Sequence, residues 1–64
     1  MEPLKTPLVG KTVEEATPII KAAKSYAVIE VVPEGYPVVP NLNLDRVRLF
    51  LDANKKIKQQ PAWG

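Results

Sequence analysis

The sequence predicts a small disulfide-free domain of the α/β or α+β class, in which one helix packs on a small sheet. Three observations carry this expectation: a helical apolar period over about Val13–Lys24, alternating apolar segments at Tyr26–Val32 and Arg46–Leu51, and the absence of cysteine from the 64 residues. We expect one domain over residues 1–64. Because so short a chain buries only about 60% of the surface that its unfolded form exposes, its core has to hold the fold without cross-links.

The predicted helix follows an N-terminal arm, and its first residues carry a capping signal. Met1–Gly10 contains two prolines and no apolar period, which favours an extended arm that ends at Gly10. Thr12 is a favourable N-cap residue, and Glu15, three residues later, completes a capping box. The apolar face of the helix, with spacings of three and four, consists of Val13, Ala16, Ile20 and Ala23, with Ile19 alongside.

Pro18 conflicts with this helix because it lies in the second turn. A proline there removes a backbone hydrogen bond, and its ring crowds the preceding turn, at a cost of about 3 kcal/mol. The sequence leaves two outcomes open: the helix kinks at Pro18, or it begins later than Val13.

Both predicted strands alternate between two faces. In the first strand, one face holds Ala27, Ile29 and Val31, and the other holds Val28, Glu30 and Val32. In the second strand, one face holds Val47, Leu49 and Leu51, and the other holds Arg46, Arg48 and Phe50. A third segment, Ile57–Trp63, could return as a short edge strand, because Pro61 is compatible only with an edge. The residues expected in the core are Ala16, Ile20, Ile29, Val47, Leu49 and Ile57.

The connection Pro33–Asp45 is long for so small a domain. Connections of this length are usually functional or disordered. Pro37 and Pro40 restrict the backbone, and each proline favours an extended residue before it. We therefore expect a stiff, extended, exposed strip around Tyr36–Leu44. The composition by itself favours a proline-rich connector with a few apolar anchors.

The composition excludes most catalytic chemistry. With neither cysteine nor histidine in the chain, thiol nucleophiles, Ser-His and Cys-His catalysis and nearly every zinc site are absent. The acidic residues Glu2, Glu30, Asp45 and Asp52, which lie outside the helix cap, show no pairing in the sequence. We expect no enzyme activity, no metal and no cofactor.

The charge pattern argues against nucleic-acid and membrane partners. The net charge is +2, and the run Lys55, Lys56, Lys58 is typical of a solvated turn. The four aromatic residues are not interleaved with basic ones, so no base-stacking surface is expected. No apolar stretch approaches the roughly 20 residues that span a bilayer, and Met1-Glu2-Pro3 shows no secretion signal. We expect a monomer.

Three strings resemble the potato inhibitor I family. They are LVGKTVEEA at 8–16, VPEGYPV at 32–38 and DRVRLF at 45–50, and they occur without gaps at the separations typical of the family. The resemblance implies a mixed sheet with two parallel central strands joined by an extended binding loop. It also implies an inhibitor of subtilisin- and chymotrypsin-like serine proteases, whose loop binds as a substrate would and is cut very slowly because the scaffold holds it in place.

The resemblance also assigns roles to individual residues. It places the scissile bond at Pro40–Asn41 and implies a protease-binding loop of Val38, Val39, Pro40, Asn41 and Leu42. Arg46 and Arg48 match a pair that supports the loop from below, and their spacing of two puts both on one strand face. Without the family, two arginines so spaced would favour an exposed polar face.

The loop departs from the family where binding should be most sensitive. Pro40 stands in place of a large apolar residue and lacks a backbone N–H. Val39 stands in place of a threonine, Asn41 in place of an acid that would bond the arginines more strongly, and Asn43 in place of a basic residue. Two hypotheses follow: an inhibitor with unusual specificity, or an engineered variant of the scaffold, chosen for stability, with weak or no inhibition.

Overall fold

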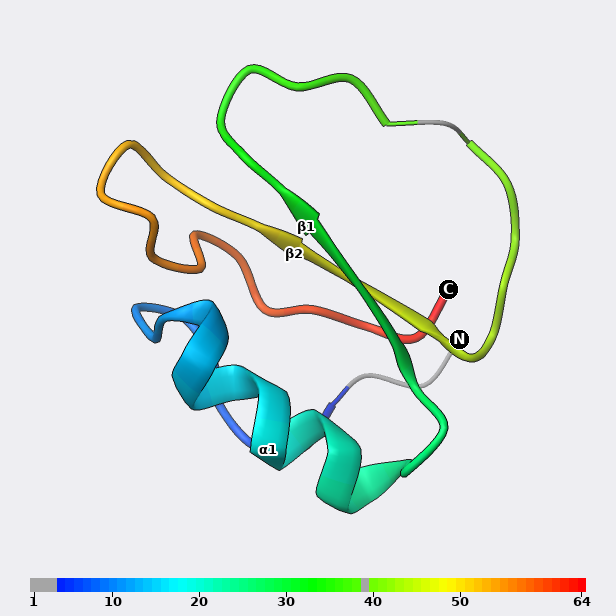
Figure 1. Ribbon diagram of the computed structural model, residues 1–64. Coiled ribbons are helices and arrows are strands. Elements are labelled where there is room, and N and C mark those ends of the chain that lie inside the picture. The colour runs from blue at the N-terminus through cyan, green and yellow to red at the C-terminus, as the bar shows by residue number, and fades with distance from the viewer. Residues whose placement is uncertain (1–3, 39) are drawn as a thin grey trace.

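The structure, a computed structural model, describes residues 4–38 and 40–64. Its elements follow in the order α1 (Val13–Ala23), β1 (Val28–Val32) and β2 (Arg46–Phe50). Figure 1 shows α1 on one side of the strands and the chain between β1 and β2 arching away on the other side. The predicted architecture of one helix packed on a small sheet is confirmed.

The helix begins where the capping signal places it. The Thr12 hydroxyl accepts a hydrogen bond from the Glu15 N–H at 3.2 Å, and the Glu15 carboxylate accepts one from the Thr12 N–H at 2.9 Å. Two backbone donors that the helix leaves unpaired are thereby satisfied. At the other end, the Lys24 N–H donates to the Ile20 carbonyl at 3.0 Å, and the helix ends one residue before the expected end. Within residues 4–38 and 40–64, no helix is long and apolar enough to cross a membrane.

Pro18 lies inside α1, which begins at Val13 as expected, so the alternative of a later helix start is excluded. The missing N–H of Pro18 would have bonded the carbonyl of Glu14, four residues earlier. Both residues are exposed, so water can take the place of that donor. One residue before, the Thr17 hydroxyl donates to the Val13 carbonyl at 2.8 Å. The capping box and the buried side chains Ala16 and Ile20 therefore hold the helix through the proline.

The two strands pair in parallel, as the resemblance implied. Their register places Glu30 opposite Arg48 and Val28 opposite Arg46. β1 begins at Val28, slightly later than expected, and β2 ends at Phe50. Along the β1 face expected to be apolar, burial falls toward the loop, since Ala27 is buried, Ile29 is half-buried and Val31 is exposed. The arrangement puts Glu30 beside the arginines of β2.

The C-terminal segment does not form the edge strand that the sequence suggested. It makes two isolated antiparallel bridges to β2 and the residue after it, Val47 to Trp63 and Leu51 to Ile57. Between these bridges the C-terminal segment advances six residues while its partner advances four. A continuous ladder needs equal numbers of residues on the two sides, and Pro61 also lacks an N–H. The pairing is mixed in direction, but regular strand structure is limited to β1 and β2 in the described residues.

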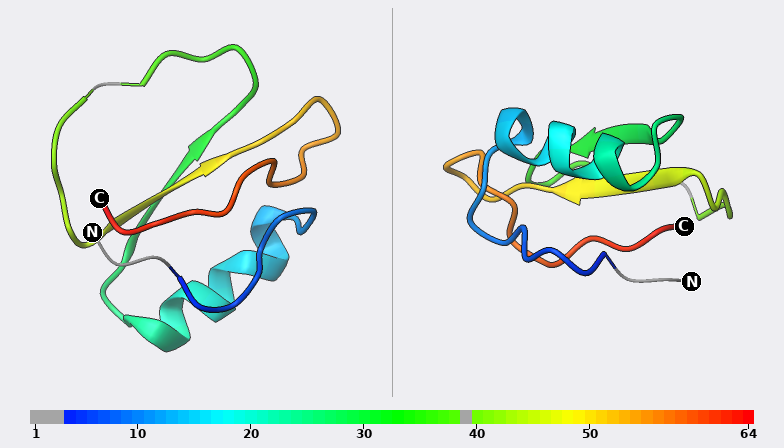
Figure 2. Two further views of the ribbon diagram at one scale, coloured as in Figure 1. Left: turned by 180° about the vertical axis from the view of Figure 1, so that it is seen from behind. Right: turned by 90° about the horizontal axis from the view of Figure 1, so that it is seen from below.

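The core lies between α1, the sheet and the two chain ends. Five of the six expected core residues are buried, and Ile29 is half-buried against them. The N-terminal arm adds Leu4 and Leu8, which were not expected in the core, and the C-terminus adds Trp63. Figure 2 shows the arm and the C-terminal segment running side by side, and the Gly10 N–H donates to the Ile57 carbonyl at 2.8 Å.

Candidate functional site

The loop between β1 and β2 leaves the sheet through a tight turn. The Tyr36 N–H donates to the Pro33 carbonyl at 3.2 Å, and Gly35 has a φ of +84°, which a residue with a side chain rarely adopts. Beyond this turn, the described residues 37–38 and 40–45 form no regular helix or strand before β2. Its large apolar side chains point to solvent, with Leu42 73% exposed. The described part of the loop is thus largely exposed to solvent. The predicted site residue Val39 lies outside the described residues.

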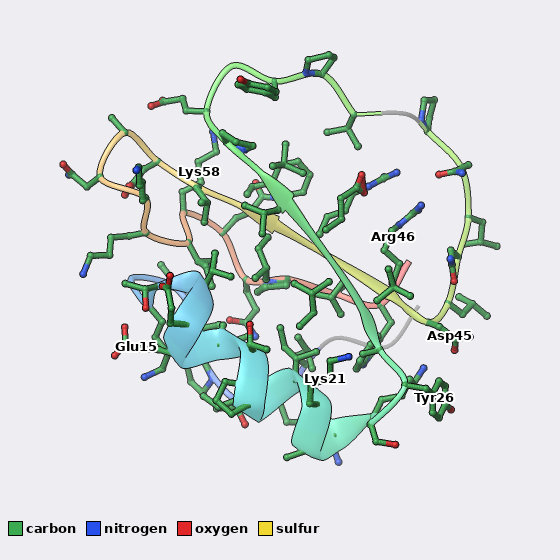
Figure 3. All side chains as sticks on the ribbon, viewed as in Figure 1. Glu15, Lys21, Tyr26, Asp45, Arg46 and Lys58 are labelled. Carbon is green, nitrogen blue, oxygen red and sulfur yellow. The ribbon has the colours of Figure 1, made fainter. Side chains whose placement is uncertain are left out.

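Asn41 is the point at which β2 holds this loop. Arg46 Nη1 donates to the Asn41 side-chain oxygen at 2.8 Å, and Arg46 Nη2 donates to the Asn41 backbone carbonyl. Arg48 Nη2 donates to the same side-chain oxygen at 3.1 Å. Figure 3 shows the Arg46 side chain extending from the start of β2 into the space that the loop encloses. Two arginines from one strand face therefore converge on one loop residue.

Glu30 of β1 lies beside both arginines. Its carboxylate oxygen Oε2 accepts a hydrogen bond from Arg48 Nε at 2.7 Å and lies 4.0 Å from Arg46 Nε. Eighteen residues separate Glu30 from Arg48, and the parallel register brings them together. This pairing was not predicted from the sequence, because an acid in an apolar strand segment gives no sign of its partner until the register is known.

The end of the loop is held by a second set of polar contacts. Lys24, just after α1, donates from Nζ to the Leu44 carbonyl at 3.0 Å and lies 3.6 Å from the Asp45 carboxylate. The Asn43 side-chain oxygen accepts a hydrogen bond from the Asp45 N–H at 3.0 Å, which forms a local turn before β2. The Lys24 ammonium also lies 4.3 Å from the centre of the Trp63 ring, a favourable cation–π geometry. Helix, loop end and C-terminus therefore meet at Lys24.

A hollow of about 410 Å³ separates the middle of the loop from the C-terminal segment. Its lining includes Pro40, Asn41 and Leu42 of the loop, Phe50 of β2 and Pro61 of the C-terminal segment. Across this hollow, the hydrogen bonds at Asn41 and the Lys24 bond at Leu44 tie the loop to the rest of the fold. Those bonds determine how rigidly the loop is presented.

The structure brings some of the predicted site residues together. Asn41 contacts Arg46 and Arg48, whereas Pro40 and Leu42 are exposed on either side of it and Val38 is half-buried. In the part of the chain that the structure describes, no cluster of three metal-binding side chains occurs. The geometry is that of an exposed peptide segment that is hydrogen-bonded on one side to two arginines of β2.

A helix, a parallel strand pair and an anchored loop define a scaffold that presents one exposed segment. The chain belongs to the potato inhibitor I family, whose model matches residues 7–64. The family and the relatives named below are protease inhibitors, not enzymes, in agreement with the expectation that this chain has no catalytic role.

Three relatives illustrate the similarity. The chain is 40% identical over 57 residues to Protease inhibitor HPI of Hevea brasiliensis, covering 89% of this chain and 81% of that protein. It is 42% identical over 57 residues to Subtilisin inhibitor CLSI-I of Canavalia lineata, covering 89% and 86%. It is 39% identical over 57 residues to Chymotrypsin inhibitor of Lumbricus terrestris, covering 89% and 66%.

A solved structure shows the same fold. The crystal structure of bitter gourd trypsin inhibitor matches with a TM-score of 0.80 at 23% identity, covering 89% of this chain and 84% of that one. The agreement extends to most of both chains and therefore includes the scaffold that carries the loop.

Proposed function

We propose that this protein inhibits serine proteases of the subtilisin or chymotrypsin type by offering residues 36–44 to the active site as a substrate-like segment. The observation that carries the proposal is the contrast between Asn41, which is hydrogen-bonded to the scaffold, and Leu42, which is exposed. Asn41 is tied to β2 through both arginines, while the next side chain, Leu42, projects into solvent. A segment so arranged can enter a cleft from one side while its other side remains attached to the scaffold.

Such an arrangement favours tight binding and slow cleavage. Ordering an exposed loop on binding costs conformational entropy, and a loop already held in its bound shape avoids much of that cost. If the Pro40–Asn41 bond is cut, the hydrogen bonds to Asn41 keep the new chain end close to its partner. The inhibitor then acts as a substrate whose products do not readily separate, which is the standard mechanism that the resemblance implies.

The loop sequence favours weak inhibition. Proline at position 40 offers a small ring to the protease specificity pocket and has no N–H for the protease backbone. One unmade hydrogen bond in a buried interface costs about 1–3 kcal/mol, or roughly one to two powers of ten in the inhibition constant. We therefore expect the parent protein to inhibit subtilisin and chymotrypsin above the nanomolar range.

Titration of subtilisin and chymotrypsin with the parent and with the triple variant Val39→Thr, Pro40→Met, Asn41→Glu tests the proposal. The triple variant regains a pocket-filling side chain, the missing N–H and an acid for the arginines, and we expect it to inhibit at least about tenfold more tightly. Val9→Met is a matched control, because it adds a methionine to an exposed site outside the loop. A folded triple variant that inhibits neither protease would refute the placement of the scissile bond at Pro40–Asn41.

The alternative, that the chain is an engineered stability variant of the scaffold, is not favoured, and the weak inhibition expected from Pro40 does not require it. The chain is 39–42% identical to three proteins that are named as inhibitors. The hydrogen bonds from Arg46 to Asn41 also attach the loop to β2. A parent protein that fails to inhibit any serine protease in a broad panel would support this alternative instead.

A further inference from the structure

The contacts behind the loop present an electrostatic problem. Arg46 and Arg48 both donate to the side-chain oxygen of Asn41, which is uncharged. The Arg46 residue is only 8% exposed, and like charges brought together away from water repel each other strongly. A buried cation needs a nearby anion or a full set of hydrogen bonds. Asn41 supplies no negative charge, so any negative charge that stabilises the arginine pair comes from elsewhere in the fold.

Glu30 is placed to supply that charge. Its carboxylate is bonded to Arg48 Nε at 2.7 Å and lies 4.0 Å from Arg46 Nε. Arg46 Nε is itself buried and has no hydrogen-bond partner among the described residues. The Glu30 side chain is 42% exposed, so its carboxylate keeps part of its hydration while it faces the arginines. The desolvation cost is therefore smaller than for a fully buried pair.

We propose that Glu30 is a positioning residue for the binding loop: its carboxylate orients the guanidinium groups of Arg46 and Arg48, and through them it fixes Asn41. The negative charge that faces the two arginines is then supplied by Glu30 of β1 and not by a loop residue. The loop residue that follows the expected scissile bond can then be neutral while the arginines stay aligned. The effect of Glu30 on a protease rests on the proposed inhibition, whereas its effect on the arginines concerns the free protein alone.

Glu30→Gln is the central variant, because it keeps the shape of the side chain and removes its charge. Glu34→Gln is the matched control, since it removes the same charge from an exposed residue near the start of the loop. Asn41→Asp supplies a second background in which the loop itself carries an acid. If the two carboxylates serve the same arginines, Glu30→Gln will have a much smaller effect in the Asn41→Asp background than in the parent, a coupling that a double-mutant cycle measures.

Two readouts separate positioning from inhibition. The first is the solvent-exchange rate of the Arg48 Nε–H by NMR in the free protein, which we expect Glu30→Gln to raise about tenfold or more and Glu34→Gln to leave unchanged. The second is the inhibition constant for subtilisin, which we expect Glu30→Gln to weaken about tenfold in the parent background. Urea unfolding establishes that each variant is folded. Should Glu30→Gln fail to fold, Glu30→Asp, which keeps the charge and withdraws it by one methylene, should change both readouts in the same direction.

Each result decides a different point. An unchanged Arg48 Nε–H exchange rate in a folded variant overturns the positioning role, whatever the protease data show. A faster exchange rate with an unchanged inhibition constant, in a parent that does inhibit, overturns the link from Glu30 to the loop. A faster exchange rate in a protein that inhibits no protease in any background supports the positioning role and refutes the proposed function.

Discussion

At the scale of single residues, the geometry of the arginine side chain explains how Arg46 holds the loop. Arg46 offers two nitrogens of one planar group to the side-chain and backbone oxygens of Asn41. A lysine carries the same charge but cannot present two donors in a fixed plane. The loop is therefore held at a defined angle as well as a defined distance. This specificity matters more here than stability, because pairs of charges in proteins often contribute little net folding free energy.

Glu15 is the residue whose ionisation the structure ties most directly to folding. The Thr12 N–H, and then the Thr12 hydroxyl, lower the pKa of the Glu15 carboxyl below its ordinary value of 4.5. Because the pKa is lower in the folded state, Glu15 contributes stability above about pH 4.5, and that contribution is lost as the pH falls through the lower, folded pKa.

We therefore expect Glu15→Gln to be less stable than the parent at neutral pH, and the difference to shrink as the pH is lowered from 5 to about 2. Urea unfolding of the two proteins across this range measures the difference. Glu14→Gln, which changes the neighbouring acid of the first helical turn without disturbing the capping box, is the control. A difference between parent and Glu15→Gln that does not vary with pH would contradict the assignment.

At the scale of the element, α1 shows that a capping box and a buried face can stabilise a helix that contains a proline. Its N-terminus is set by the capping box and its inner face by Ala16 and Ile20, and both persist although Pro18 interrupts the hydrogen bonding. The cost of the proline falls on an exposed position, where water can bond the unpaired carbonyl. A proline on the buried face would leave that carbonyl without any partner.

We expect Pro18→Ala to raise the free energy of unfolding by about 1–3 kcal/mol, because alanine restores an N–H for the Glu14 carbonyl and relieves the ring clash. The gain is reduced by the greater freedom of the unfolded chain without proline. Urea or thermal unfolding measures it, and Ala22→Gly, at another exposed position of the same helix, should lower stability by about 1 kcal/mol. A Pro18→Ala variant less stable than the parent would show that the proline helps to shape the helix.

At the scale of the whole molecule, the fold depends on one core without cross-links. The residues of the core cluster come from the arm, α1, the sheet and its flanks, and the C-terminal segment. Leu49 lies at the centre of this cluster with no exposed surface. The described loop residues stand outside the core cluster, and the role that we propose for them is in binding.

Leu49→Ala should lower the free energy of unfolding by about 2–5 kcal/mol, because it leaves a cavity that the surrounding side chains fill only in part. Leu42→Ala is the matched control, since Leu42 is 73% exposed in the loop and should change stability by less than about 0.5 kcal/mol. Urea unfolding compares the two variants. Equal losses at both positions would contradict the separation of core and loop.

Much of the fold follows from interactions between residues close together in the chain. Thr12 and Glu15 are three residues apart and fix the helix start through their own hydrogen bonds, so the start could be predicted from the sequence. The alternation in β2 likewise predicted that Val47 and Leu49 are buried and that the arginines face elsewhere. The family motifs extended this to the parallel strand pair and to the loop as the candidate site.

The remaining features depend on contacts between distant residues. Glu30 meets Arg48 because a parallel register aligns two strands separated by a long loop, and no local pattern encodes that register. The C-terminal segment fails to form a strand because its bridges to β2 are unequally spaced. Leu8 is fully buried because the C-terminal segment covers an arm that looks like an extended tail in the sequence. Local hydrogen bonding and side-chain period can be inferred from neighbours in the chain, whereas register and burial depend on how the whole chain packs.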